Sequence, residues 1–190
     1  GEVLRTVHGP RYRLLVIGAG QLSHYLANIA LMLDYQVTIC DPRPEYHGTW
    51  QAQPGVTLSS QMPDDLVLAM QLDANSAVVC VTHDPKLDDL ALIEALKTPA
   101  FYIAAIGSRR NNERRRERLL EFDLTRKEVD RMRGPAGLSI GALTPPEIAL
   151  AIVAEMTAMR RGVDLAGPLA DWSGSATECR IESLGISDRG

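Results

Sequence analysis

A glycine-rich turn between an apolar strand and an apolar helix constrains the fold of this chain more than any other feature. Leu14 to Ile17 are apolar and predict a buried strand, which leads directly into Gly18-Ala19-Gly20. Apolar residues then recur at helical spacing, and a second apolar run, Val37 to Cys40, ends in Asp41. Strand, glycine turn, helix, strand and acid in this order predict the first half of a dinucleotide-binding βαβ unit.

The turn predicts a ligand that carries negative charge. The helix after it begins with free backbone N–H groups, and its dipole favours a phosphate there. We expect Gly18 and Gly20 to let the ligand approach the backbone, with Gln21 and Leu22 beside it. Asp41 is placed to accept hydrogen bonds from ribose hydroxyls, because it ends a strand about 20 residues after the turn.

One residue departs from the G-x-G-x-x-G pattern, because Ser23 stands at the position of the third glycine. Serine adds only a hydroxymethyl group, so we expect the fold to survive. A doubly wound fold that keeps the turn without binding a dinucleotide stays an alternative.

Strands and helices alternate along the rest of the chain. Apolar runs at 77–81 and 102–106 predict strands, and capping-box spacing at 125–128 and 144–147 predicts helix starts. This alternation predicts a doubly wound α/β fold, with a mostly parallel sheet and helices on both faces. We expect an arm or linker at 1–12, a Rossmann-like domain at 13–161 and an irregular tail at 162–190. We further expect a loop at 42–54, a last strand or an extended loop at 138–141, and helix starts at 62–65 and 84–85.

Three strand ends should meet at one edge of this sheet, where ligands bind in open α/β folds. The glycine turn is the first; Thr82-His83-Asp84 and Gly107-Ser108-Arg109 are the others. The last group suits a phosphate, through a backbone turn, a hydroxyl and a guanidinium. His83 is the catalytic candidate, since Asp84 could orient its imidazole, but Asp84 alone as a helix cap explains the pair equally well.

A basic helix is predicted after the third strand end, with six arginines between positions 109 and 118. A solvated face paired with Glu113 and Glu117 and a partner-binding face are both compatible with this pattern. Nucleic acid is not expected as a partner, because stacking aromatics are missing and the net charge is −4.

Several chemistries have no support in the sequence. Its three cysteines form no metal-spaced pair, so we expect no metal site. No nucleophile elbow or Walker lysine loop occurs. No run of about 18 apolar residues predicts a membrane span, and we expect a cytoplasmic protein.

The most specific segments are His-Asp-Pro-Lys at 83–86, Gly-Ser-Arg-Arg at 107–110 and Thr-Pro-Pro-Glu-Ile-Ala at 144–149. Val-Ile-Gly-Ala-Gly at 16–20, Val-Thr-Ile-Cys-Asp-Pro-Arg at 37–43 and the glycine-rich stretch 134–142 accompany them. Together they resemble the C-terminal domain of the xanthine dehydrogenase accessory protein (XdhC/CoxI) family over roughly residues 13 to 161. That family usually has glycine where Ser23 stands and His-Val where this chain has Gln21-Leu22, and its separate N-terminal domain has no counterpart here.

The resemblance implies a Rossmann-like domain that helps to mature a molybdenum hydroxylase. Family members bind the molybdenum cofactor, assist its sulfuration with a cysteine desulfurase and deliver it to the apoenzyme. The expected ligand is molybdopterin or its cytosine dinucleotide, and a homodimer is expected. The residues implied in cofactor binding are Gly18, Gly20, Gln21, Leu22, Asp41, Arg43, Thr82, His83, Asp84, Gly107, Ser108 and Arg109.

Two other functions stay open. An NAD(P)-dependent oxidoreductase would use Asp41 to favour NAD, because an acid repels a 2′-phosphate, with His83 as its acid–base residue. A regulatory Rossmann domain without catalysis would keep the turn as a vestige.

Overall fold

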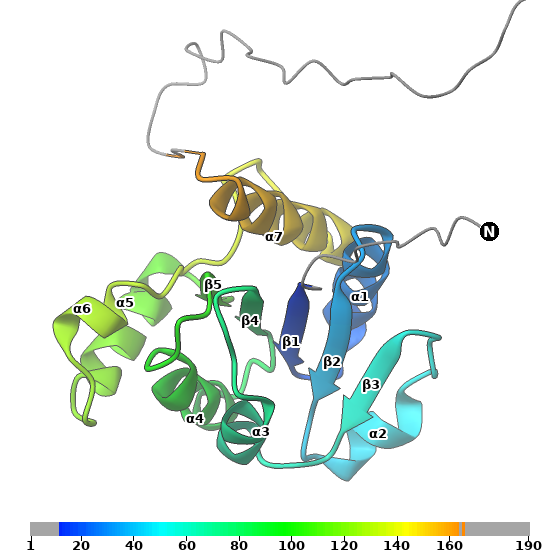
Figure 1. Cartoon of the computed structure of the whole chain (residues 1–190), viewed down its shortest axis with the longest axis horizontal. Helices are drawn as coiled ribbons and strands as arrows, with labels where there is room; N and C mark the ends of the chain where they lie inside the picture. Colours follow the sequence, from blue (N-terminus) through cyan, green and yellow to red (C-terminus); the bar gives the residue numbers. More distant parts are fainter. Residues whose placement is uncertain (1–11, 164, 166–190) are drawn as a thin grey trace, which may run out of the picture.

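Five parallel strands form the sheet of this protein, whose computed structural model describes residues 12–163 and 165. The strand order is β3-β2-β1-β4-β5, which matches the first five positions of the order 3-2-1-4-5-6 of a dinucleotide-binding fold (Figure 1). The predicted parallel α/β fold is therefore confirmed. The strands are β1 (Arg13–Ile17), β2 (Gln36–Cys40), β3 (Val56–Ser59), β4 (Ser76–Cys80) and β5 (Tyr102–Ala105).

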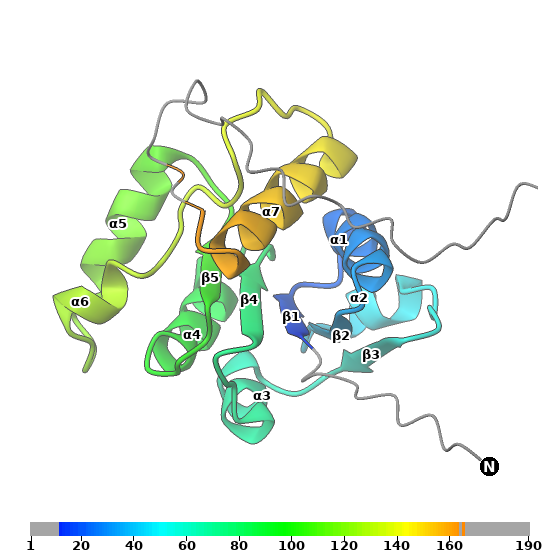
Figure 2. The same ribbon diagram turned by 45° about the horizontal axis from the view of Figure 1, so that its top comes forward.

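Helices cover both faces of this sheet, as the alternation of elements predicts (Figures 1 and 2). α1 and α7 pack against each other on one face, while α3, α4 and α5 lie on the other. The helices are α1 (Gln21–Met32), α2 (Pro44–Thr49), α3 (Pro63–Met70), α4 (Pro85–Ala95), α5 (Arg109–Leu119), α6 (Arg126–Val129) and α7 (Pro145–Arg160). No helix in this part of the chain is long and apolar enough to cross a membrane.

The central strand β1 contributes side chains to the hydrophobic cores on both faces of the sheet. Successive side chains of a strand point to opposite faces, so Leu14 and Val16 pack toward α1 and α7. Leu15 and Ile17 pack into the second core with α3, α4 and α5. All four are 0% exposed, which explains the unbroken apolar run in the sequence.

The strand register brings the carboxyl ends of four strands level. Ile17 is the partner of Cys40 on β2 and of Cys80 on β4, and Cys80 is the partner of Ala105 on β5. The segments that follow these strands therefore meet at one edge of the sheet, as predicted.

Two expectations about the connecting segments need correction or completion. The proline-rich stretch 42–54 is not all loop, because it contains α2, which begins at Pro44 with Glu45 in its first turn. Trp50 follows α2 and stacks on His24 of α1 with 3.8 Å between ring centroids. Residues 138–141 form an extended loop without strand pairing. The predicted arm and tail lie almost entirely outside the described residues.

Candidate functional site

The glycine turn joins β1 to α1 with two glycines that play different parts. Gly18 has φ +114°, and a Cβ there would lie 3.1 Å from the backbone nitrogen of Thr82. Gly18 is therefore required by the fold. Gly20 has φ −84°, an ordinary value, and a Cβ there would have open space within 4 Å. The fold itself does not require glycine at position 20.

The N-terminus of α1 is uncapped. Gly20 is its N-cap, and no side chain of the described chain accepts a hydrogen bond from the first turn. By contrast, the Ser108 hydroxyl caps α5 and the Glu147 carboxylate accepts from the Thr144 amide at the start of α7. The helices α2 and α3 also lack a side-chain cap, but both have acidic residues in their first turn, and α1 has none there. A helix start with free N–H groups and no side-chain partner is an anion-binding arrangement.

Ser23 explains how the fold survives without the third glycine. Its side chain is 0% exposed, and its hydroxyl donates a 2.6 Å hydrogen bond to the Gly18 carbonyl. The hydroxyl thus stays within the turn and does not separate α1 from the sheet.

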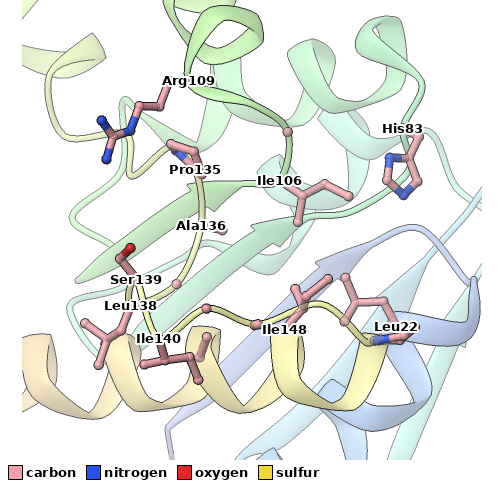
Figure 3. Close-up of a pocket in the computed structure, with 16 residues that line it drawn as sticks. Leu22, His83, Ile106, Arg109, Pro135, Ala136, Leu138, Ser139, Ile140 and Ile148 are labelled. Atoms are coloured by element: carbon pink, nitrogen blue, oxygen red, sulfur yellow. The ribbon is translucent and has the colours of Figure 1, made fainter.

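A cavity of about 620 Å³ lies at the carboxyl ends of β4 and β5, against α7, and Leu22 in the first turn of α1 borders it. This volume is typical of small-molecule sites. Its lining is mainly apolar: Figure 3 shows Ile106, Ile148 and Leu22 along it, with Arg109 at one end and His83 at the other. First-turn residues of three helices contribute, namely Leu22 of α1, Arg109 of α5 and Pro145 of α7.

The loop 134–142 forms one wall of the cavity through residues 135–142, although the sequence pattern does not mark it as part of a site. It is anchored along β5, because the Arg133 backbone exchanges hydrogen bonds with the strand and the Ala136 amide donates to the Ala105 carbonyl. The buried Glu155 of α7 holds it from the other side, because its carboxylate accepts from the Gly137 amide at 2.9 Å and from Arg133 Nε at 3.0 Å. In the sequence, only the glycines and the proline of this stretch indicate a loop.

His83 lines the cavity in an unusual backbone conformation, with φ +61°. The residue before it is fixed, since the Thr82 hydroxyl donates to the buried Asp88 at 2.7 Å and accepts from the Asp84 amide at 2.9 Å. Asp84 is the N-cap of α4, as predicted, and accepts from the Lys86 amide. Asp84 is therefore engaged in capping, which is the structural alternative to an acid–base pair with His83.

Arg115 of α5 connects the ends of β4 and β5. Its guanidinium lies 3.1 Å from the Asp88 carboxylate and donates to the Ile106 carbonyl. Burial raises the pKa of Asp88, and the Thr82 hydrogen bond and Arg115 oppose that rise. The expectation that the helix arginines pair with Glu113 and Glu117 needs correction. Arg115, Arg116 and Arg118 instead bind acids or carbonyls of other elements, and Arg109, Arg110 and Arg114 are exposed.

Asp41 is fully buried at the end of β2, and both carboxylate oxygens already have partners. Oδ2 accepts from the Ala19 amide at 2.9 Å and from Arg43 Nη2 at 2.8 Å, and Oδ1 accepts from Arg43 Nε at 2.8 Å. Burial alone would raise the pKa of Asp41, but the hydrogen bonds from Arg43 and Ala19 outweigh it and the pKa is lowered. Asp41 is therefore ionised and paired with Arg43.

The predicted site residues divide into two groups. Leu22, His83, Gly107 and Arg109 line the cavity directly. The others do not line it: Gly18, Gly20, Gln21, Asp41, Arg43, Thr82, Asp84 and Ser108 form the turn, the caps and the ion pair around it. Within residues 12–163 and 165, no cluster of three or more His, Cys, Asp or Glu side chains could hold a metal ion.

Relatives of this chain include a probable xanthine dehydrogenase component of Bacillus subtilis, 30% identical over 81% of the chain and 44% of the relative. The molybdenum cofactor insertion chaperone PaoD of Escherichia coli is 31% identical over 47% of the chain and 28% of its own length. A crystal structure described as a xanthine dehydrogenase from Bacillus halodurans superposes with a TM-score of 0.66 at 27% identity. The match covers 84% of this chain and 46% of that one.

The chain thus spans less than half the length of each of these relatives. The family described as the XdhC Rossmann domain matches residues 14–156. This range takes in the sheet except Arg13, every helix but the end of α7, and all twelve predicted site residues. From this match over most of its length, the chain belongs to the XdhC Rossmann domain family.

Proposed function

We propose that this domain binds the molybdenum cofactor and hands it to a molybdenum hydroxylase apoenzyme of the xanthine dehydrogenase type. The observation that carries the proposal is the uncapped N-terminus of α1 beside an apolar cavity. A pterin cofactor with a phosphate matches both parts, since its flat ring suits apolar walls and its phosphate suits free helix N–H groups. The cofactor is cargo here, so a site without an evident catalytic set is sufficient.

The electrostatics of the cavity support an anionic cargo. Among the described residues that line it, Arg109 alone carries a full positive charge and none is acidic. Arg109 is exposed at the end of the cavity opposite Leu22 of α1, so its guanidinium is free to bind another anionic group of the cargo through two N–H groups. Exposure also favours release, because a weakly buried ion pair is readily exchanged for water.

The interpretation as an NAD-dependent oxidoreductase has less support. It needs a carboxylate free to accept ribose hydroxyls, whereas both oxygens of Asp41 are engaged and the side chain is 0% exposed. The form of the cofactor, its sulfuration with a cysteine desulfurase and self-association remain predictions from the family resemblance.

A transfer assay tests the proposed function. The purified chain is loaded with cofactor released from a donor enzyme and mixed with a cofactor-free hydroxylase, whose recovered activity is measured. Arg109→Ala should lower the recovered activity by about tenfold, since it removes a charge-assisted contact. Arg126→Ala on α6 is the matched control, because that arginine is also exposed but does not line the cavity. Equal transfer by the two variants, or no gain over free cofactor, would overturn the proposal.

A sulfuration arm uses the same mixture with a cysteine desulfurase and cysteine added before the apoenzyme. If the domain assists sulfuration, recovered activity should rise only when the chain is present during that step. An equal rise without the chain would remove sulfuration from its function and leave the transfer result intact.

A further inference from the structure

At the end of β2, the guanidinium of Arg43 covers the buried carboxylate of Asp41. In the Asp41–Arg43 pair the carboxylate is 0% exposed and the guanidinium side chain is 23% exposed. The anion therefore lies beneath and the cation faces outward. A ligand that approaches this edge of the sheet meets Arg43 and cannot reach Asp41.

The guanidinium is held in one orientation. Nε and Nη2 both donate to Asp41, at 2.8 Å each, and the guanidinium carbon lies 4.0 Å above the centre of the Tyr46 ring. Nη1 has no hydrogen-bond partner in the part of the chain that the structure describes. A fixed guanidinium with a free N–H edge is prepared to bind an anion at little entropic cost.

The Arg43 guanidinium lies next to the glycine turn. A single oxygen, Oδ2 of Asp41, accepts from the Ala19 amide at 2.9 Å and from Arg43 Nη2 at 2.8 Å. Two donors to one oxygen lie close together, so the guanidinium borders the turn and the uncapped start of α1. A phosphate at the turn would lie within reach of both.

We propose that Arg43, positioned by Asp41, is the ligand-reading residue at the end of β2 and that it binds a phosphate monoester. The acid that binds a ribose diol in NAD enzymes here serves as the buried anchor of that arginine. The proposal rests on the proposed function only for the identity of the ligand, because a terminal phosphate on a pterin and a 2′-phosphate on a nucleotide present the same chemistry to Arg43.

Two matched pairs of probes test it, each pair differing by one phosphate monoester. The first is the stable oxidised pterin derivative of the cofactor, with its phosphate and after phosphatase treatment. The second is NADP and NAD. Affinities are measured by fluorescence titration for the wild type and for Arg43→Gln, Arg43→Lys and Asp41→Asn, each checked for a cooperative melt.

In the pair that binds, the phosphorylated member should bind about tenfold or more tightly to the wild type. Arg43→Gln should abolish that preference, and Arg43→Lys should keep part of it, because lysine retains the charge without the fixed fork. Asp41→Asn should keep part of the preference for the phosphorylated member, because in this proposal Asp41 positions Arg43 and does not bind ribose hydroxyls. Equal binding of both members, or a preference that survives Arg43→Gln, would overturn the proposal.

The outcomes separate the two proposals. A preference for NADP that depends on Arg43, with no binding of the pterin, supports the phosphate role and overturns the proposed function. Binding of the phosphorylated pterin that Arg43→Gln does not weaken supports the proposed function and overturns the phosphate role of Arg43. Tighter binding of NAD than of NADP overturns both, as does the absence of binding by all four probes.

Discussion

Replacing Gly20 by serine should stabilise the free protein and weaken its cofactor binding. Gly20 has φ −84° and ψ −175°, an N-cap geometry that serine favours, and its Cβ would meet nothing within 4 Å. The serine hydroxyl would accept from the first-turn N–H groups of α1. It would then occupy the donors that we assign to a phosphate.

The two effects have opposite signs and separate origins. Serine gains a few tenths of a kcal/mol over glycine as an N-cap. Removing a glycine whose backbone angles suit other residues adds about 0.4–1 kcal/mol through the unfolded state. A total of about 1 kcal/mol corresponds to a rise in Tm of about 3 °C for a chain of this size. Loss of a charge-assisted hydrogen bond to the phosphate should weaken binding by about tenfold to hundredfold.

The same substitution at Gly18 is the matched control. Its φ of +114° and the 3.1 Å approach to the Thr82 nitrogen predict strain of about 2–4 kcal/mol. Its Tm should fall by about 5–15 °C. Scanning calorimetry gives the Tm values, and titration with the phosphorylated pterin gives the affinities. Unchanged affinity in Gly20→Ser would refute the assignment of the phosphate to α1, and a lowered Tm would refute the reasoning about the cap.

Three further predictions concern the charged groups around the site. Because the pKa of Asp41 is lowered in the folded protein, its carboxylate stabilises the fold fully above the unfolded pKa of about 4, and this stabilisation is lost as pH falls through the folded pKa. Between pH 6 and pH 3.5, the free energy of unfolding in urea should therefore fall less for Asp41→Asn than for the wild type. An equal fall in both proteins would contradict the ion pair. Arg115→Met leaves the buried Asp88 without its arginine and should cost about 3–5 kcal/mol in urea unfolding, whereas a cost below about 1 kcal/mol would show that the pair is not structural. Glu155→Gln loosens the hold on Arg133 and Gly137, so limited proteolysis should cut the loop 134–142 faster than in the wild type; an unchanged cutting rate would remove Glu155 from that role.

The sequence-based prediction succeeded where structure is local. The apolar run at 14–17, the glycine turn and the cap at Asp84 depend on neighbouring residues, and the sheet class follows from their repetition. Register then brings the strand ends together without further information, because parallel strands of similar length end at one edge. Capping by Asp84 with Pro85 at the first helical position was correct for the same reason.

It failed where a side chain reaches another element. Asp41 was correctly placed at a strand end, but its pairing with Arg43 depends on the direction of both side chains and changes the role of the acid. Arg115 follows the helical spacing of a solvated face, yet it is 6% exposed because Asp88 lies opposite on α4. The loop 134–142 becomes a cavity wall only through the edge of β5 and Glu155, which are distant in sequence.

The most direct test of the central claim is the amount of cofactor that the purified chain retains. The chain is incubated with molybdenum cofactor released from a donor enzyme and passed through a gel-filtration column, and molybdenum and pterin are measured in the protein peak. A wild-type ratio near one cofactor per chain, reduced by about tenfold in Gly20→Ser and unaffected by excess NAD, is the expected result. The claim would be contradicted if molybdenum eluted with the small molecules for both the wild type and Gly20→Ser, or if excess NAD displaced the cofactor from the wild type.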